Sequence, residues 1–373
     1  MLLAFSVIFV LAYVFIIRTP PQPPVPDLRE VTGAYTWTSS AGSPAGRSGA
    51  GAFTAVAAGD AGGTFRPAAA DSGSLTSRYE AASRTESTAA TVAASPEAGV
   101  TVGSWPPAWR LATRSPLDYQ GLSAVVRAAV EDGDTAVGVK PLEQEGRKVW
   151  RAAIKLDGST QELVVDQASG LVTWWTDGTS TFVADVDWGA PAEVPAAPAA
   201  DAGLVTVDRA YSYELSLAAA GRAAGFEPLA SGLAPDGFAE AAVATAEAGE
   251  APASWDPTGA ADGPRQIAQL FTRGLTWFEV RQLGPAASTA AAFGRAVATA
   301  RATALSFEQA ELQYGVFAGH TASTWYAASG PALLAGDGRR AVYVTGALTR
   351  QELVSFAEGL KPLGAGEAAS PAP

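Results

Sequence analysis

The stretch Gly138–Trp188 reads GVKPLEQEGRKVWRAAIKLDGSTQELVVDQASGLVTWWTDGTSTFVADVDW. Apolar-rich runs alternate in it with short turn signals, at Glu145-Gly146, Asp157-Gly158-Ser159, Gly170 and Asp177-Gly178. An Asp-Gly pair between alternating runs is the strongest short-range signal for a β-hairpin. The stretch therefore predicts an antiparallel meander, and the rest of the chain is organised around it.

Two runs of this meander show which side chains share a face. Apolar positions repeat with a period of two in Lys148–Leu156 and again in Thr181–Trp188. Alternate side chains of a strand point to opposite faces, so one apolar face must cover a core, a helix or a lipid-like ligand. The residues predicted for that face are Trp150, Ala152, Ile154 and Leu156 from the first run and Phe182, Ala184, Val186 and Trp188 from the second.

The aromatic residues of the meander have two interpretations, and the sequence leaves both open. Either Trp150, Trp174, Trp175 and Trp188 belong to a core, or some of them line a hydrophobic cavity. Under the second interpretation the candidate ligand-binding residues are Trp150, Ile154, Trp174, Phe182, Val186 and Trp188.

Length and composition limit the class of protein. A chain of 373 residues with 48% hydrophobic residues is expected to form two globular domains. Its net charge of −12 argues against a nucleic-acid partner, which requires a basic surface. The chain has no cysteine, which excludes disulfides, thiol nucleophiles and thiolate metal ligands.

The N-terminal segment Met1–Ile17 is apolar and carries no charged side chain. Its length is near the short end of the ~17–25 residues that span a bilayer as a helix. A cleaved signal peptide is the alternative, but the segment lacks a basic start and an A-x-A site before Arg18. We therefore expect a transmembrane anchor, followed over Arg18–Glu30 by a proline-rich, semi-rigid stalk.

The first folded domain is predicted over Val31–Trp188, mainly as β-structure. Short strands are expected ahead of the meander, at Ala34–Thr38, Ala52–Ala57, Leu75–Ala81 and Val100–Trp105. A helix is predicted over Ser115–Glu131, with Ser115 as its cap, Pro116 at the first helical position and Gly133 as its stop. Its apolar stripe consists of Leu122, Val125, Val126, Ala129 and Val130, and needs an apolar partner such as the meander.

These elements resemble a known superfamily, the LolA/LolB lipoprotein carriers and the RseB/MucB-type periplasmic regulators of sigma factors. The resemblance rests on the segments Pro116–Leu122, Val149–Ile154, Leu163–Gln167, Gly170–Thr173 and Thr181–Trp188. It implies an open, curved antiparallel sheet, a LolA-like half-barrel, with a helix in its hollow. It further implies that the hollow binds acyl chains or senses envelope components outside the cytoplasm. This chain departs from the family in its predicted helical tether.

An Ala/Pro-rich linker, residues 189–204, separates a second domain at residues 205–362, and residues 363–373 are expected to be a disordered tail. The second domain is predicted to be α+β and resembles the small C-terminal domains of such regulators. The expected elements are helices at Tyr213–Ala224, Ala287–Ala304 and Thr349–Leu360, a hairpin of Arg265–Phe271 with Leu275–Gln282, and strands at Ala239–Thr245, Glu311–Phe317, Ala322–Ala328 and Ala341–Thr345. Thr349 and Glu352 have the spacing of a capping box.

The sequence offers few groups suited to catalysis. His320 is the only histidine and lies in a predicted turn, so neither a Ser–His–Asp triad nor a histidine metal cluster is expected. Asp185 and Asp187 form an Asp-x-Asp pair that could bind a cation, but strand alternation favours a face in water. We expect no catalytic residues, no metal and no cofactor, and hence a protein that is not an enzyme.

Two functions remain. The first is a membrane-anchored extracytoplasmic regulator that binds an envelope or anti-sigma partner, or a lipid-like ligand. The second is a tethered lipid or lipoprotein carrier. Both are implied by the resemblance, and both place the chain in the cell membrane with its domains outside the cytoplasm.

Overall fold

A computed structural model describes residues 31–39, 49–57, 63–65, 68–69, 75–80, 88–95, 99–102, 119–156, 158–167, 170–187, 205–206, 211–214, 216–232, 234–235, 237–246, 266–273, 276–285 and 287–364. Across these residues the protein is an α+β fold with two large sheets, a small third sheet and four helices. The predicted anchor, the stalk, the linker and most of the tail lie outside them. No helix in this part of the chain combines the length and the apolar character needed to cross a bilayer.

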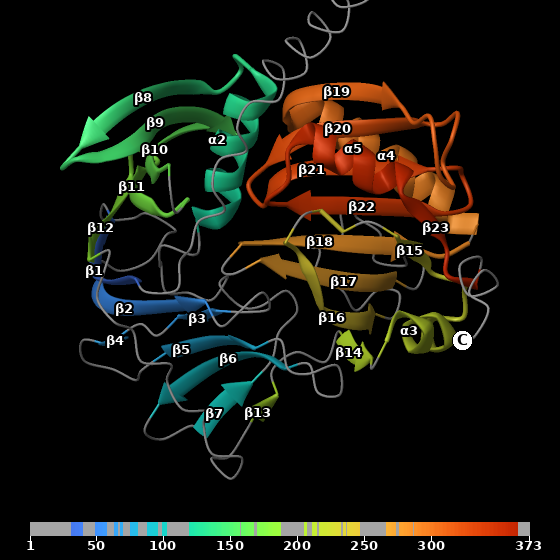
Figure 1. Ribbon diagram of the computed structural model, residues 1–373, viewed down its shortest axis with the longest axis horizontal. Helices are drawn as coiled ribbons and strands as arrows, with labels where there is room; N and C mark the ends of the chain where they lie inside the picture. Colours follow the sequence, from blue (N-terminus) through green and yellow to red (C-terminus); the bar gives the residue numbers. More distant parts are fainter. Residues whose placement is uncertain are drawn as a thin grey trace, which may run out of the picture.

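The first sheet has 13 strands within these ranges. They are β1 (Val31–Ser39), β2 (Gly49–Ala57), β3 (Gly63–Phe65), β4 (Ala68–Ala69), β5 (Leu75–Glu80), β6 (Thr88–Ser95), β7 (Gly99–Val102), β8 (Gly138–Gln144), β9 (Arg147–Leu156), β10 (Ser159–Asp166), β11 (Val172–Thr176), β12 (Ser180–Asp187) and β13 (Val205–Thr206). Their order is β13-β7-β6-β5-β3-β2-β1-β12-β11-β10-β9-β8, with β4 beside β2. Figure 1 shows this sheet as a curved wall along the left and bottom of the molecule.

The predicted meander is confirmed as β8 to β12, each strand antiparallel to the next. Its turns contain Gly146, Gly158, Gly170 and Gly178, which have φ values of 77°, 78°, 71° and 85°. Glycine adopts this left-handed conformation without the steric penalty of a side chain. The predicted face is confirmed where it is described: Ala152, Ile154, Leu156, Phe182 and Ala184 are buried.

The order of the first sheet brings distant segments together. β1 pairs with β12, so the first strand of the domain closes onto the last strand of the meander. At the other end β13 pairs with β7, although the sequence places Val205 in the second domain. Both pairings are non-local, and periodicity within a strand carries no information about them.

The helix predicted before the meander is α2 (Gln120–Asp132), and Gly133 ends it in the left-handed conformation as expected. The predicted caps Ser115 and Pro116 lie outside the described residues. Of the predicted stripe, Leu122, Val125, Val126 and Ala129 are buried. Val130, in the last turn, is 41% exposed instead and lies outside the buried stripe.

The second domain is built on a sheet of eight strands in the described ranges, with a further two-stranded sheet beside it. The strands of the large sheet are β14 (Tyr211–Glu214), β16 (Ala239–Ala246), β17 (Gln266–Arg273), β18 (Thr276–Leu283), β19 (Leu305–Glu311), β20 (Thr321–Ala327), β21 (Gly330–Gly336) and β22 (Ala341–Gly346). The small sheet pairs β15 (Leu229–Ser231) with β23 (Leu360–Pro362). The helices are α3 (Leu217–Ala224), α4 (Ala287–Thr303) and α5 (Arg350–Glu358).

Two predictions in the second domain need correction, and one strand was missed. Tyr213 and Glu214 belong to β14 rather than to a helix, because Ser216 caps α3 by accepting a hydrogen bond from the Ala219 amide. The segment 312–317 is a loop, and its strand, β19, lies earlier in the chain. β21 was not predicted at all: it is buried along its whole length and therefore shows no polar alternation.

Candidate functional site

The inner face of the meander is covered by the start of α2. The ring of Tyr119, just before the helix, lies 4.9 Å from the ring of Trp175 and 4.9 Å from that of Phe182. Leu122, Val125 and Val126 belong to the same buried cluster. At these positions the hollow expected from the resemblance is therefore filled by the chain's own helix.

The six predicted ligand-binding residues do not share one surface. Ile154 and Phe182 are fully buried, and Trp150 and Val186 pack at the edge of the same core. Trp174 lies on the opposite face of the sheet, under the guanidinium of Arg151, and the inner position belongs to Trp175. Trp188 lies outside the described residues. A ligand-binding role for this set remains a prediction.

Helix α2 also contacts the second domain, and the contact begins at Gly121. A Cβ atom placed on Gly121 would lie 2.1 Å from the carbonyl oxygen of Ala328 and 2.8 Å from the Cα of Ser329. Only glycine permits this approach to the turn between β20 and β21. The buried cluster accordingly continues from the meander through α2 to Ala244, Ala268, Leu270 and Trp277 of the second sheet.

The other end of α2 meets the second domain through charged groups, and we define this region as the Arg350 junction: Asp132, Asp134, Ser306, Glu308 and Arg350. The Asp134 amide donates to the Ala129 carbonyl at 2.8 Å, which wraps the chain around Gly133. The Asp134 carboxylate in turn accepts from the Ala136 amide at 2.8 Å. These bonds fix the Asp134 carboxylate just after the end of α2, and the Asp132 carboxylate lies beside it on the last residue of the helix.

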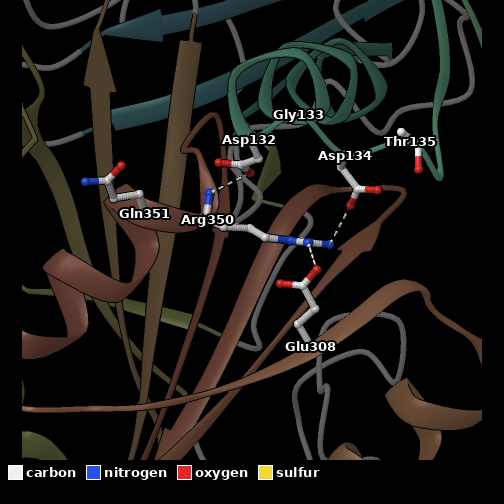
Figure 2. A pocket seen from close by; sticks show the side chains of 7 residues that line it. All are labelled: Asp132, Gly133, Asp134, Thr135, Glu308, Arg350 and Gln351. Atoms are coloured by element: carbon white, nitrogen blue, oxygen red, sulfur yellow. Dashed lines mark hydrogen bonds and ion pairs between the residues drawn. The ribbon is translucent and has the colours of Figure 1, made fainter. Parts of the chain in front are cut away.

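Arg350 is the centre of the junction and is only 9% exposed. Its Nη2 lies 3.1 Å from Asp134 Oδ2 and donates to the Ser306 carbonyl at 2.5 Å, while Nη1 donates to Glu308 Oε1 at 2.5 Å. Its backbone amide donates to Asp132 Oδ2 at 3.2 Å. Figure 2 shows the guanidinium lying between Asp134 and Glu308, with Asp132 above the start of α5. The ring of Tyr326 lies 4.4 Å from the guanidinium carbon, a distance suited to a cation–π contact.

Ser306 reaches the junction because the backbone of β19 is irregular there. Its φ of 55° is in the left-handed region, and the register with β20 shifts between Leu305 and Glu308. Such a bulge re-aims side chains at the cost of local strain. As a result the Ser306 hydroxyl donates to Asp134 while its carbonyl accepts from Arg350.

The two aspartates of the junction have pKa values shifted in opposite directions. Burial raises the pKa of Asp132, and the Arg350 amide and charge offset only part of that effect. Burial also raises the pKa of Asp134, but hydrogen bonds from Ser306 and the Ala136 amide, with the charge of Arg350, outweigh it and leave the pKa below its usual value. Of these two aspartates, Asp134 therefore holds its negative charge more firmly.

A pocket of about 470 Å³ opens beside the junction, lined by Asp132, Gly133, Asp134, Thr135, Glu308, Arg350 and Gln351. Its lining suits recognition of polar or charged groups. His320 lies in the loop between β19 and β20 and is exposed, as predicted for a turn residue. The part of the chain that the structure describes contains no group of three or more His, Cys, Asp or Glu placed to hold a metal ion.

None of the junction residues was predicted from the sequence, although one signal was available. Asp132 ends α2 and Arg350 begins α5, so each has the wrong sign for the dipole of its own helix. Charges that contradict their helix are expected where another element compensates for them. Here the acidic end of α2 and the cationic start of α5 supply each other with the opposite charge.

No protein-family model matches the sequence. A search of curated proteins also finds no match. Among solved structures, the crystal structure of MucB is 12% identical, with 91% of this chain and 94% of that chain covered and a TM-score of 0.31. The Pseudomonas aeruginosa MucA/MucB complex is 13% identical over 90% and 95% of the two chains, with a TM-score of 0.27. MucB in complex with MucA(peri) is 14% identical over 90% and 94%, with a TM-score of 0.27. Likeness at this level does not determine the function, which must be argued from the contacts described above.

Proposed function

We propose that this chain is a membrane-anchored, extracytoplasmic binding protein that regulates a partner and catalyses no reaction. The partner would be an envelope or anti-sigma protein, in keeping with the sequence resemblance to RseB/MucB-type regulators. The observation that carries the proposal is the Arg350 junction. One buried cation there binds acceptors from both halves of the molecule, next to a polar pocket.

Such a junction suits regulation because its bonds can be exchanged. A partner that offers its own charged groups to Glu308 or Arg350 would compete with bonds between the two halves. Glu308 is 61% exposed at its side chain, so one side of the junction is open to such a partner. The carrier alternative requires an open inner face on the meander, whereas Ile154 and Phe182 are fully buried, which favours partner binding.

Partner binding is tested by crosslinking the tagged full-length chain in its native membranes and identifying what co-purifies. We expect one membrane protein with a regulatory segment on the same side of the membrane. Its yield should fall in Arg350→Gln and remain unchanged in Arg339→Gln, an exposed arginine of the turn after β21. Equal recovery with both variants would remove the junction from recognition, and repeated failure to recover any specific protein would contradict the proposal.

The membrane anchor and its orientation are tested separately. Fusions of alkaline phosphatase and of a fluorescent protein to the C-terminus report the side on which the domains lie. We expect phosphatase activity and no fluorescence, with the chain retained in the membrane fraction after an alkaline wash. Fluorescence alone would contradict an extracytoplasmic location.

A further inference from the structure

In the described strand order the two large sheets end at β13, β8, β14 and β19, and these edges differ in what they offer a further strand. β13 and β14 have only two and four residues. β8 is longer, but Pro141 in its middle has no amide hydrogen, a feature that blunts sheet edges. β19 has seven residues and no proline, and Figure 1 shows it at the upper rim of the second sheet. Of these edges, β19 is the one best suited to pair with another strand.

The backbone of β19 has groups that face away from the sheet. The Leu312 amide, just after the strand, donates to the His320 carbonyl at 3.0 Å, on the side of β20. In an antiparallel pair, successive residues alternate between facing the partner strand and facing away from it. The backbone groups of Ala310 therefore face β20, whereas those of Gln309 and Glu311 face outward.

These outward groups are available to an added strand. No described strand pairs with the outer edge of β19, and no described group accepts from the amides of Gln309 and Glu311. The Glu311 carbonyl has one distant donor, the side chain of Gln313 at 3.4 Å. The amide of Gln313, the next outward position, already donates to the Glu358 carboxylate at 2.7 Å. The open part of the edge is therefore centred on Gln309 and Glu311.

The side chains around this edge carry an excess of negative charge. Carboxylates lie on the strand and in the pocket beside it, at Glu308, Glu311, Asp132 and Asp134. Two arginines contact the strand, and both are engaged: Arg350 holds Glu308, and Arg301 donates to the Gln309 side chain at 3.2 Å. Glu311 is exposed and forms no ion pair with another described residue. Because like charges on neighbouring strands destabilise their pairing and opposite charges stabilise it, the edge favours a basic segment over a second copy of β19.

From these observations we propose that β19 receives an extended, basic segment of the partner as an added strand. Main-chain hydrogen bonds to Gln309 and Glu311 would hold the segment, and its alternate side chains would select it. One set of these side chains falls on the face of α5, beside Glu308 and the pocket, and the other on the face of α4, beside Glu311. The inference rests on the proposed function for the existence of a partner, and adds how that partner is held.

Strand addition is tested by fluorescence anisotropy with labelled peptides and the purified full-length chain in detergent micelles. The probe is a peptide of about six residues, valine and threonine with lysines, the length of an ordinary strand. One matched peptide has glutamates in place of the lysines. Another keeps the lysines but has two successive central amides methylated, so that either of its edges lacks a donor. We expect the lysine peptide to bind, and both matched peptides to bind at least about ten-fold more weakly.

The protein side is tested by Gln309→Pro, which removes an outward amide as Pro141 does in β8. The pairing with β20 does not use this amide, so the fold should be kept, which circular dichroism checks. The lysine peptide should bind about ten-fold more weakly to Gln309→Pro, and about two- to five-fold more weakly to Glu311→Gln. Glu143→Gln is the control, an exposed acidic residue on the edge strand β8, and should leave binding unchanged.

Three results would overturn the proposal. The first is equal binding of the methylated and unmethylated lysine peptides, since charge alone would then account for the contact. The second is binding of the lysine peptide that Gln309→Pro does not weaken. The third is a dimer of the full-length chain in sedimentation that Gln309→Pro dissociates, since a second copy would then occupy the edge.

Failure of the proposed function gives a different result. If crosslinking in membranes recovers a partner whose yield falls in Arg350→Gln but not in Gln309→Pro, the regulatory role stands and the strand addition is wrong. If no partner is recovered while the lysine peptide binds as expected, the edge accepts a basic strand and the regulatory role is contradicted.

Discussion

At the residue scale, Arg350 and Gly121 show how single positions join the two halves. Arg350 is the first residue of α5, where the helix dipole disfavours a cation, and the carboxylates of Asp134 and Glu308 supply the opposite charge. Gly121 has no side chain because a carbonyl oxygen occupies the place of its Cβ.

Replacing Arg350 by glutamine should lower the free energy of unfolding by about 3 kcal/mol, because it leaves acidic groups without their cation. Arg339→Gln, in an exposed turn, should change it by no more than about 0.5 kcal/mol. Chemical denaturation with tryptophan fluorescence measures both. If Arg350→Gln lowered the free energy of unfolding as little as Arg339→Gln does, the junction would contribute little to stability.

Gly121→Ala should destabilise the fold by about 1–3 kcal/mol, because the added methyl group must displace backbone atoms of Ala328 and Ser329. Gly294→Ala is a matched control within a helix: a Cβ there has nothing within 4 Å. That control should stabilise by about 0.5–1 kcal/mol through helix propensity. Urea unfolding measures both variants. If Gly121→Ala and Gly294→Ala changed the free energy of unfolding equally, the close approach of α2 to the second sheet would be contradicted.

At the scale of elements, the C-terminal end of α2 and the start of α5 act as one unit. The Thr349 side chain and Glu352 form the predicted capping box, which is confirmed, and the Arg350 amide turns outward to Asp132. The start of α5 thereby donates a hydrogen bond to the end of α2, and opposite charges from the two helix ends face each other. The strained Ser306 of β19 completes this contact.

The pH dependence of this contact follows from Asp134. Its pKa is lowered in the folded protein, so its contribution to stability is present above the usual aspartate pKa and is lost as the pH falls through the lower folded value. The difference in unfolding free energy between the natural chain and Asp134→Asn should therefore be largest near neutral pH and shrink in acid. A difference that is constant over this range, measured by denaturation at each pH, would rule out this role.

At the scale of the whole molecule, two sheets share a buried cluster that passes through α2. Figure 1 shows the helix standing between the upper end of the first sheet and the second sheet. Because apolar side chains from both halves bury one another, neither half retains its full core alone. The two halves are thus expected to be energetically coupled.

Coupling predicts a single cooperative thermal transition, seen at the same temperature by far-ultraviolet circular dichroism and by calorimetry. Arg350→Gln combined with Gly121→Ala should weaken the contact between the halves and separate the transition into two. Two transitions in the unaltered chain would show that the halves unfold independently.

The sequence was sufficient for those elements whose signals are local. The meander could be predicted from Asp157-Gly158 and Asp177-Gly178, and α5 from the capping box of Thr349. The sequence did not predict β21, because a strand that is buried along its whole length shows no polar alternation. It also placed the start of α3 too early, because the helical period continues ahead of the Ser216 cap.

By itself, then, the sequence determined the alternating faces of β9 and β12, the glycine turns between strands, and the stop of α2 at Gly133. These depend on backbone sterics and side-chain period, which act over a few residues. Only the tertiary structure decided that Gly121 faces Ala328, and that Arg350 meets Asp134 and Glu308. Asp134 and Arg350 are more than two hundred positions apart, and their attraction arises only after both sheets have folded around α2.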